Sequence, residues 1–309
     1  MANFTVGNMI REARIRQKIS QEELSDGICT PSTLSRIENG VQMPGKRILE
    51  ALTQRLGITE TIYNTYSNPQ EIELYEVEQN LMRSLGKRDF TQAQLLKEKL
   101  KQKVKQIKKK DIGIRMEEQY LLFAEAMIEG EKRSIDITIL EKLIQALRIT
   151  VPEFDGKHIK NHLLTFQEIT ILNNIACVYY ALGKRLEAIR LLIEVKEYIE
   201  FHVQEGEASS VKYPMVIQNI ATWLGKAGQY EEVLKFCQAG IAYCIEYGKL
   251  SVFPLLLFNQ ACALAELGQV RYAEMKFHES AIIFQATNQR EYAEKVKTYT
   301  QIHYHMTVL

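Results

Sequence analysis

Apolar residues recur at intervals of three and four along almost the whole chain, and this spacing predicts helices rather than strands. In residues 46–56, for example, the apolar positions are Ile48, Leu49, Leu52 and Leu56. From Glu71 onward prolines are few, and the alternation typical of a half-buried strand is almost absent. We therefore expect an all-α protein.

The first 56 residues predict a compact bundle of four or five short helices. The first helix should span about residues 6–17. Its inward positions are Met9, Ile10, Ala13 and Ile15. Ser20 is placed to begin the second helix as its N-cap, and Glu23 completes a capping box three residues later. Pro44 and Gly45 interrupt the chain before the helix over 46–56.

Two of these helices meet at a tight turn within residues 21–40. The apolar positions are Leu24 and Ile28 on the first helix and Leu34 and Ile37 on the second. Thr30 is a good N-cap for the second helix, Pro31 suits its first position, and Gly40 can close its end. This spacing is typical of a helix-turn-helix unit.

The open face of the second helix is predicted to carry three hydroxyl groups and one guanidinium. These side chains are Ser32, Thr33, Ser35 and Arg36. Short polar side chains on such a helix can hydrogen-bond base edges in a major groove. We expect this helix to bind a double-stranded DNA operator.

The segments QEEL and STLSRIENG resemble the lambda-repressor-like (XRE) class of DNA-binding domains over about the first 60 residues. The resemblance implies that Gln21 contacts a phosphate and that Ser32, Thr33 and Arg36 face bases. It also implies a structural ion pair between Arg14 and Glu38. The segment from Leu24 to Glu38 is one residue shorter than in the commonest members. Its DGIC turn instead resembles the Rgg and PlcR type of peptide-pheromone receptor regulators.

The best domain boundary lies in residues 64–69, which hold Asn, Ser and Pro beside two tyrosines, Tyr63 and Tyr66. We expect a DNA-binding domain over residues 1–66. A second, helical domain should follow over residues 67–309.

A repeat is visible in the second domain. Gly183, Gly228 and Gly268 each follow a small residue by seven positions, and the small residues are Ala176, Ala221 and Ala261. A small residue lets two antiparallel helices approach closely, and a glycine ends the first of them. This pattern resembles the tetratricopeptide repeat, with weaker copies near Gly130 and near Lys87-Arg88. Five hairpins and a last helix over about 290–303 would form a right-handed α-solenoid with a concave face.

Asparagine stands nine residues before each aligned glycine, at Asn174, Asn219 and Asn259. An amide offers both a donor and an acceptor, so it can hold a peptide backbone without reading its sequence. In the Rgg and PlcR type receptors, asparagines on inner helices have that role. The resemblance therefore implies a peptide-binding groove at these three residues, with Asn173 and Gln218 assisting. The alternative is that these amides are merely solvated.

The amino-acid composition limits the classes of protein to which this chain can belong. The 309 residues are 46% hydrophobic and 25% charged, which is ordinary for a soluble chain of two domains. No run of about 18 apolar residues occurs, and Arg11, Glu12 and Arg14 lie where a secretory signal would need an apolar core. We expect a cytoplasmic protein with no membrane partner.

Catalytic and metal chemistry find little support in the sequence. The five cysteines are scattered without CxxC spacing, and no GxSxG, HExxH or phosphate-binding glycine loop occurs. His158 with His162, and His303 with His305, are best explained as surface histidines. The lysine-rich stretch 97–110 keeps an apolar stripe and is better explained as a solvated amphipathic helix than as a second nucleic-acid surface. We expect no enzyme activity, no cofactor and no metal site.

Residues 1–66 hold eight Lys and Arg against seven acids, so this domain is barely basic. Useful affinity for DNA would then need a homodimer on two half-sites. Together these patterns predict a transcription regulator whose repeat domain senses a short signalling peptide. Two alternatives remain: a ligand-free dimeric repressor that uses its repeats only to dimerise, and a protein-interaction scaffold.

Overall fold

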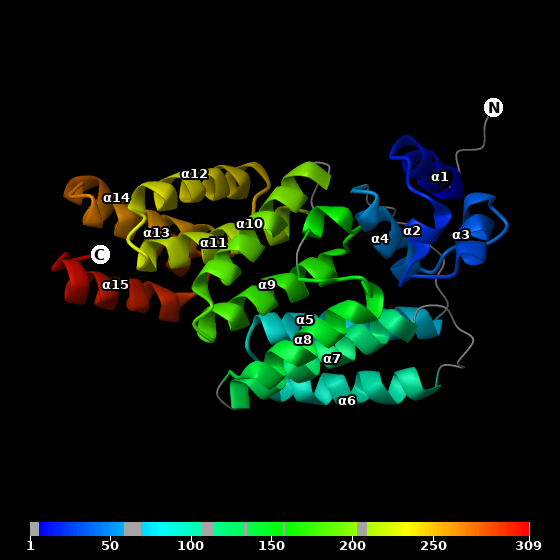
Figure 1. Ribbon diagram of the computed structural model, residues 1–309. Coiled ribbons are helices and arrows are strands. Elements are labelled where there is room, and N and C mark those ends of the chain that lie inside the picture. The colour runs from blue at the N-terminus through cyan, green and yellow to red at the C-terminus, as the bar shows by residue number, and fades with distance from the viewer. Residues whose placement is uncertain are drawn as a thin grey trace. The chain divides into compact units, whose positions relative to one another are not determined.

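The computed structural model describes residues 6–58, 69–106, 114–132, 135–156, 158–202 and 209–308. Within these ranges the chain forms fifteen α-helices and one short 3-10 helix, and no strand (Figure 1). The prediction of an all-α protein is confirmed. Among the described helices, none combines the length and the apolar character needed to cross a membrane.

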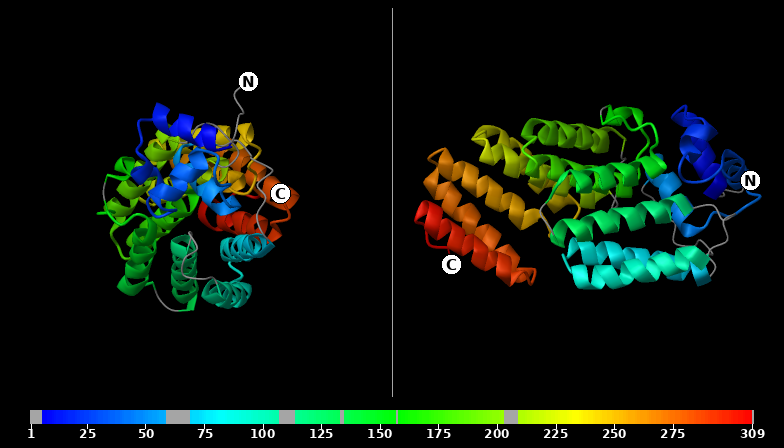
Figure 2. Two further views of the ribbon diagram at one scale, coloured as in Figure 1. Left: turned by 90° about the vertical axis from the view of Figure 1, so that its right-hand side faces the viewer. Right: turned by 60° about the horizontal axis from the view of Figure 1, so that its bottom comes forward.

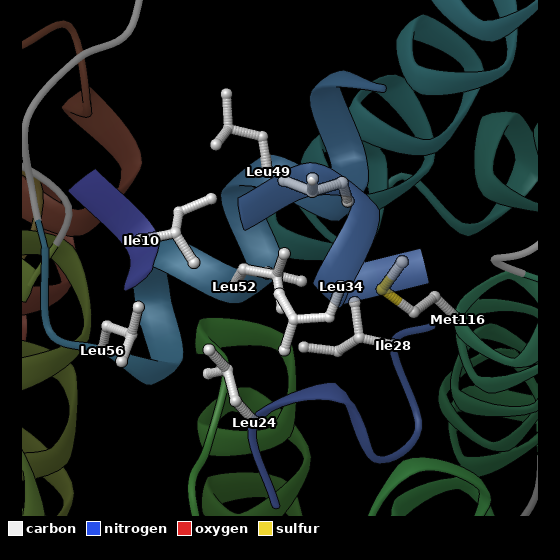
Figure 3. Packing of buried hydrophobic residues seen from close by; sticks show 10 residues of the cluster. Ile10, Leu24, Ile28, Leu34, Leu49, Leu52, Leu56 and Met116 are labelled. Atoms are coloured by element: carbon white, nitrogen blue, oxygen red, sulfur yellow. The ribbon is translucent and has the colours of Figure 1, made fainter. Parts of the chain in front are cut away.

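The N-terminal bundle consists of four helices. They are α1 (Val6–Arg16), α2 (Gln21–Ser25), α3 (Pro31–Glu38) and α4 (Lys46–Arg55). Ile10, Leu24, Leu34 and Leu52 meet in its core and are inaccessible to solvent (Figure 3). The four helices are too short to be stable through helix propensity alone. Burial of apolar side chains from all four stabilises the bundle.

The local signals at the helix ends act as the sequence predicts. Ser20 and Glu23 form the capping box at the start of α2, and the Thr30 side chain caps α3 with Pro31 in the first helical position. Gly40 has a positive φ of 69° just after α3. One core prediction was wrong: Ile15 is 56% exposed. It lies five residues after the buried Ile10, about 140° around the helix, and therefore faces solvent.

The rest of the chain is a series of paired helices. They are α5 (Pro69–Gly86), α6 (Phe90–Gln106), α7 (Ile114–Lys132), α8 (Ile137–Thr150), the 3-10 helix η1 (Ile159–Asn161), α9 (Phe166–Ala181), α10 (Arg185–His202), α11 (Ser209–Lys226), α12 (Tyr230–Glu246), α13 (Phe253–Glu266), α14 (Val270–Ala286) and α15 (Arg290–Tyr304). Neighbouring helices pack against each other, as in the pairs α7 with α8, α11 with α12 and α13 with α14 (Figure 2). The pairs resemble tetratricopeptide repeats.

The repeat residues have the roles expected of them. Gly183, Gly228 and Gly268 have φ angles of 82°, 75° and 75°, in the left-handed region that favours glycine. The alanines seven positions before them are completely buried: Ala176, Ala221 and Ala261. A larger side chain at these alanines would push the paired helices apart.

The chain divides into two compact units. The first comprises Met1–Glu194 with Glu200–Gln204, and the second comprises Val195–Ile199 with Glu205–Leu309. The first unit thus holds the N-terminal bundle together with α5 to α9. In the second, α15 packs on α14 and closes a core that includes Phe277, Phe284 and Val296.

Two features of the sequence lie partly outside the described residues. The expected boundary at 64–69 is one of them, together with Tyr63 and Tyr66. The lysine-rich stretch is described as far as the end of α6, where Leu100 is buried and Lys101 and Lys105 are exposed. This part is amphipathic, as expected.

Candidate DNA-recognition helix and candidate peptide groove

The helix α3 has a buried side and an open side. Leu34 and Ile37 lie in the bundle core, while Ser32 and Arg36 are exposed and Ser35 is half-buried. The open side therefore presents two hydroxyls and one guanidinium on a helix that is fixed from behind by apolar packing. Such an edge can enter a major groove without exposing apolar surface.

Thr33 lies elsewhere than predicted. It is only 5% exposed, so the expectation that it belongs to the open face was wrong. Its hydroxyl lies 2.9 Å from the hydroxyl of Thr30, and its backbone N–H donates to the same oxygen at 3.2 Å. Both bonds draw Thr33 toward the N-cap, where its side chain supports the start of α3.

The ion pair implied between Arg14 and Glu38 is present. Nε of Arg14 donates to Oε1 of Glu38 at 2.6 Å, and Nη2 donates to Oε2 at 2.8 Å. Burial raises the pKa of Glu38, but hydrogen bonds from Arg14 and Gln21 outweigh it and hold that pKa below its usual range. The pair is bidentate and lies at the end of α3, so it fixes this helix against α1.

Gln21, the expected phosphate contact, also joins this pair. Its Nε2 donates to Oε2 of Glu38 at 2.8 Å. The amide has a second N–H that this bond does not use. Gln21 is therefore held at the start of α2 with one donor left for an acceptor outside the protein.

In the second unit, polar side chains connect α11 and α13. Nδ2 of Asn259 donates to the hydroxyl of Thr222 at 3.0 Å and to the carbonyl of Gln218 at 3.4 Å. Nε2 of Gln218 donates to the same hydroxyl at 3.0 Å. Asn219 is half-buried on α11, at the position equivalent to Asn259. We call these four residues the amide seam.

The two candidates on α9 are placed differently. Nδ2 of Asn174 donates to the carbonyl of Thr170 in its own helix at 2.8 Å, and the residue is half-buried. Asn173 is only 4% exposed, so it offers little surface to a ligand. Both belong to the first unit.

Aromatic rings border the second unit's seam. Phe258 of α13 makes edge contacts with Phe277 of α14 and Tyr299 of α15, at ring-centroid distances of 5.7 and 5.2 Å. The hydroxyl of Tyr304 donates to Glu266 at 3.1 Å. The sequence did not reveal the two tyrosines, because their approach depends on how α15 packs back on the repeats.

Lys212 is a further residue that the sequence did not reveal. It lies on the same half-buried stripe of α11 as Met215, Asn219 and Thr222, at intervals of three and four. Burial lowers the pKa of Lys212 to about 8. In the part of the chain that the structure describes, no carboxylate pairs with its amine.

The cysteines and the possible metal ligands give little indication of a functional site. All five cysteines are free, and burial raises the pKa of Cys177 to about 11 and that of Cys262 to about 12, which keeps both thiols protonated and weakly nucleophilic. The described residues contain no group of three or more His, Cys, Asp or Glu that could hold a metal ion.

A helix-turn-helix family matches residues 10–62 of this chain. No curated protein has a significantly similar sequence. Among solved structures, PlcR from Bacillus thuringiensis in complex with the peptide PapR7 and DNA has a TM-score of 0.57 and 20% sequence identity, covering 94% of this chain and 98% of PlcR.

ComR from S. thermophilus, in complex with DNA and its signalling peptide ComS, has a TM-score of 0.51 and 16% identity, covering 95% of this chain and 98% of ComR. The apo form of the competence regulator ComR from Streptococcus vestibularis has a TM-score of 0.51 and 17% identity over 96% of this chain and 97% of that protein. Residues 10–62 are therefore a helix-turn-helix domain, and the whole chain has the fold that PlcR and ComR share.

Proposed function

We propose that this protein is a homodimeric transcription regulator whose repeat domain binds a short signalling peptide, and that the peptide alters DNA binding. The observation that carries the proposal is the amide seam between α11 and α13, on a chain whose α3 presents an open polar edge. PlcR and ComR, which share the fold, have been crystallised with both DNA and a peptide.

In the DNA-binding half, Arg36, Ser32 and Ser35 read bases, and Gln21 uses its free N–H on a phosphate. A guanidinium can bond a guanine in two places, so Arg36 should carry most of the discrimination. Because the domain is barely basic, one copy binds weakly, and two copies on two half-sites supply the affinity.

In the second unit, Asn219 and Asn259 hold the peptide backbone, and Gln218 assists. In the first unit, Asn174 is the candidate amide. Neighbouring Phe258 and Tyr299 provide apolar surface for hydrophobic side chains. Lys212 adds one half-buried cation, and a carboxylate of the peptide would give its amine a counter-ion. The ligand class is thus a short, mainly apolar peptide with one acidic group.

The mechanism is a population shift. A peptide that binds one curvature of the repeats better than another favours that curvature, and the paired DNA-binding domains change their fit to the two half-sites. A coupling of about 1–3 kcal/mol, or roughly 5- to 150-fold in DNA affinity, is typical of such regulation.

The test is capture of peptides from spent medium of the source cells by the purified full chain, read by mass spectrometry. The comparison protein changes Asn174, Asn219 and Asn259 to Ala. A matched control changes three exposed amides instead, namely Asn80, Gln92 and Gln102. A peptide retained by the native chain and the control but lost from the triple-asparagine variant supports the proposal.

A second candidate function is a dimeric repressor without a ligand. The amides of Asn174 and Asn259 already bond within the protein, which is what a purely structural role would require. If the triple-asparagine variant and the native chain retain the same peptides at several growth stages, this second candidate is favoured. Its DNA binding would then not respond to Asn219→Ala.

A further inference from the structure

Two arginines of α4 join the N-terminal bundle to the first repeat helices. Arg47 pairs with Glu78 of α5 and with Glu117 of α7. The side chains of the two glutamates are only 1% and 5% exposed. A guanidinium that joins two inaccessible carboxylates cannot be removed without leaving buried charge unpaired.

Arg55, two turns further along α4, joins more elements still. Its Nη1 donates to the carbonyl of Leu24 at 3.3 Å and to that of Asp26, at the end of α2. Its Nη2 donates to the carbonyl of Thr150, at the end of α8, at 3.3 Å and lies 3.5 Å from a carboxylate oxygen of Glu168 on α9. One buried guanidinium thus connects the helix before the turn to two helices of the repeats.

The turn itself is in backbone contact with the repeats. Gly27, with a φ of 69°, lies between α2 and α3. A Cβ at this position would fall 2.5 Å from the carbonyl oxygen and 2.7 Å from the Cα of Thr150. Only glycine permits both the positive φ and this approach.

Further contacts extend the same interface. Met116 of α7 is buried within the core of the N-terminal bundle, beside Ile28 and Leu34 (Figure 3). Oε1 of Gln54 accepts the backbone N–H of Phe166, the first residue of α9, at 2.9 Å. The hydroxyl of Tyr75 on α5 donates to Glu50 of α4 at 3.1 Å. The bundle and these repeat helices therefore share one continuous core.

Ion pairs hold this interface together, but in the described part of the chain some of its buried polar atoms have no hydrogen-bond partner. Among the described residues, Nε of Arg55 and Oε2 of Glu117 are buried without a hydrogen-bond partner. Such groups make the docked arrangement less stable than a completely bonded one. A modest change in α8 or α9 can therefore alter the docking.

We propose that Arg47, Arg55 and Gly27 form an orienting seat, through which the first repeats set the direction of the recognition helix. In a dimer, that direction determines which spacing of half-sites both copies can reach. The three residues are positioning residues that touch no base. This inference rests on the proposed function in that DNA is bound as two half-sites.

The seat also explains how α9 could act on DNA binding. Phe166, Glu168 and Asn174 belong to the same helix, so a movement of α9 reaches Gln54 and Arg55 directly. A peptide held at Asn174 would therefore act through α9 on the turn that precedes α3.

The test uses the full-length protein. A half-site is first selected from random DNA duplexes, and pairs of half-sites are then offered at spacers that increase by single base pairs over two helical turns. The native chain should prefer one spacing by about tenfold or more. Arg55→Met and Arg47→Met should reduce that preference to about twofold while changing the affinity for a single half-site by less than about twofold. Arg55→Lys should give an intermediate preference, because it keeps the charge but only part of the bonding.

Two controls separate the possible failures. Arg83→Met removes an exposed arginine of α5 and should leave the spacing profile unchanged. Arg36→Ala should weaken recognition of the half-site without changing the preferred spacing. If Arg55→Met keeps the native spacing profile, the inference is overturned even though DNA binding stands.

Hydrogen exchange gives a readout that needs no DNA. In Arg55→Met, the amides of residues 24–30 and of residues 150–168 should both exchange faster than in the native chain, about tenfold or more. Unchanged exchange in both segments would overturn the seat whether or not the protein binds DNA. If the native chain binds no duplex specifically but hydrogen exchange changes as expected, the proposed function is contradicted. The seat would then still stand as an orienting contact.

Discussion

Lys212 lies on the half-buried stripe of α11, and no carboxylate among the described residues offsets its charge. Burial disfavours the charged form of an amine, which is why its pKa falls from an ordinary 10.5 to about 8. Below about pH 8 the amine is charged in both the folded and the unfolded chain, and folding must bury that charge. Above it the folded chain releases the proton first.

The pH dependence of stability follows with a definite sign. Between about pH 8 and 10.5 the unfolded chain binds more protons at Lys212 than the folded chain, so this residue makes stability rise with pH in that window. Lys212→Met should raise the melting temperature at pH 7 and remove part of this rise. The exposed Lys101→Met serves as the matched control. Equal melting temperatures for Lys212→Met and the native chain at pH 7 would contradict the argument.

At the scale of elements, the turn between α2 and α3 differs from the turn after α3. Gly27 and Gly40 both have a φ of 69°. A Cβ at position 27 would clash with the backbone of Thr150, whereas a Cβ at position 40 would meet no atom within 4 Å. Comparing substitutions at the two glycines therefore distinguishes the effect of a side chain on a left-handed backbone from its effect on the contact with Thr150.

A pair of alanine substitutions measures that difference. Gly40→Ala should destabilise the protein by about 1–2 kcal/mol, the usual effect of a side chain in the left-handed region. Gly27→Ala should destabilise it further, because α8 and the turn must move apart. Urea unfolding followed by circular dichroism would measure both variants. Equal losses would show that the contact with Thr150 relaxes without effect.

At the scale of the whole molecule, the small basic excess of the N-terminal domain makes two half-sites important. Each phosphate contact releases counterions, and the dependence of affinity on salt increases with the number of contacts. A homodimer that places both recognition helices on DNA makes twice as many phosphate contacts as one bound copy.

Salt titration therefore tests the assembly that we propose. Plotted as the logarithm of affinity against the logarithm of salt concentration, binding to the preferred pair of half-sites should have a slope roughly twice that for a single half-site. Fluorescence anisotropy with labelled duplexes measures both slopes. Equal slopes would mean that only one copy contacts DNA and that the dimer does not bind both half-sites.

Much of this fold could be predicted from local patterns. The capping box at Ser20, the N-cap at Thr30 and the buried alanines before the repeat glycines are short-range signals, and the structure places them as expected. The candidate site was predicted less completely. Thr33 was expected on the open face but is drawn to the N-cap by two hydrogen bonds, and periodicity alone does not distinguish a hydroxyl that caps a helix from one that faces solvent.

By itself, the sequence determined the all-helical class, the helix-turn-helix unit and the repeats, because caps, turns and helical periodicity act between residues that are close along the chain. Only the tertiary structure decided what the arginines of α4 do. Arg55 bonds Thr150 across 95 positions, and Gln54 bonds Phe166 across 112. Contacts between such distant residues depend on how whole helices pack, and no local pattern in the amino-acid sequence specifies that packing.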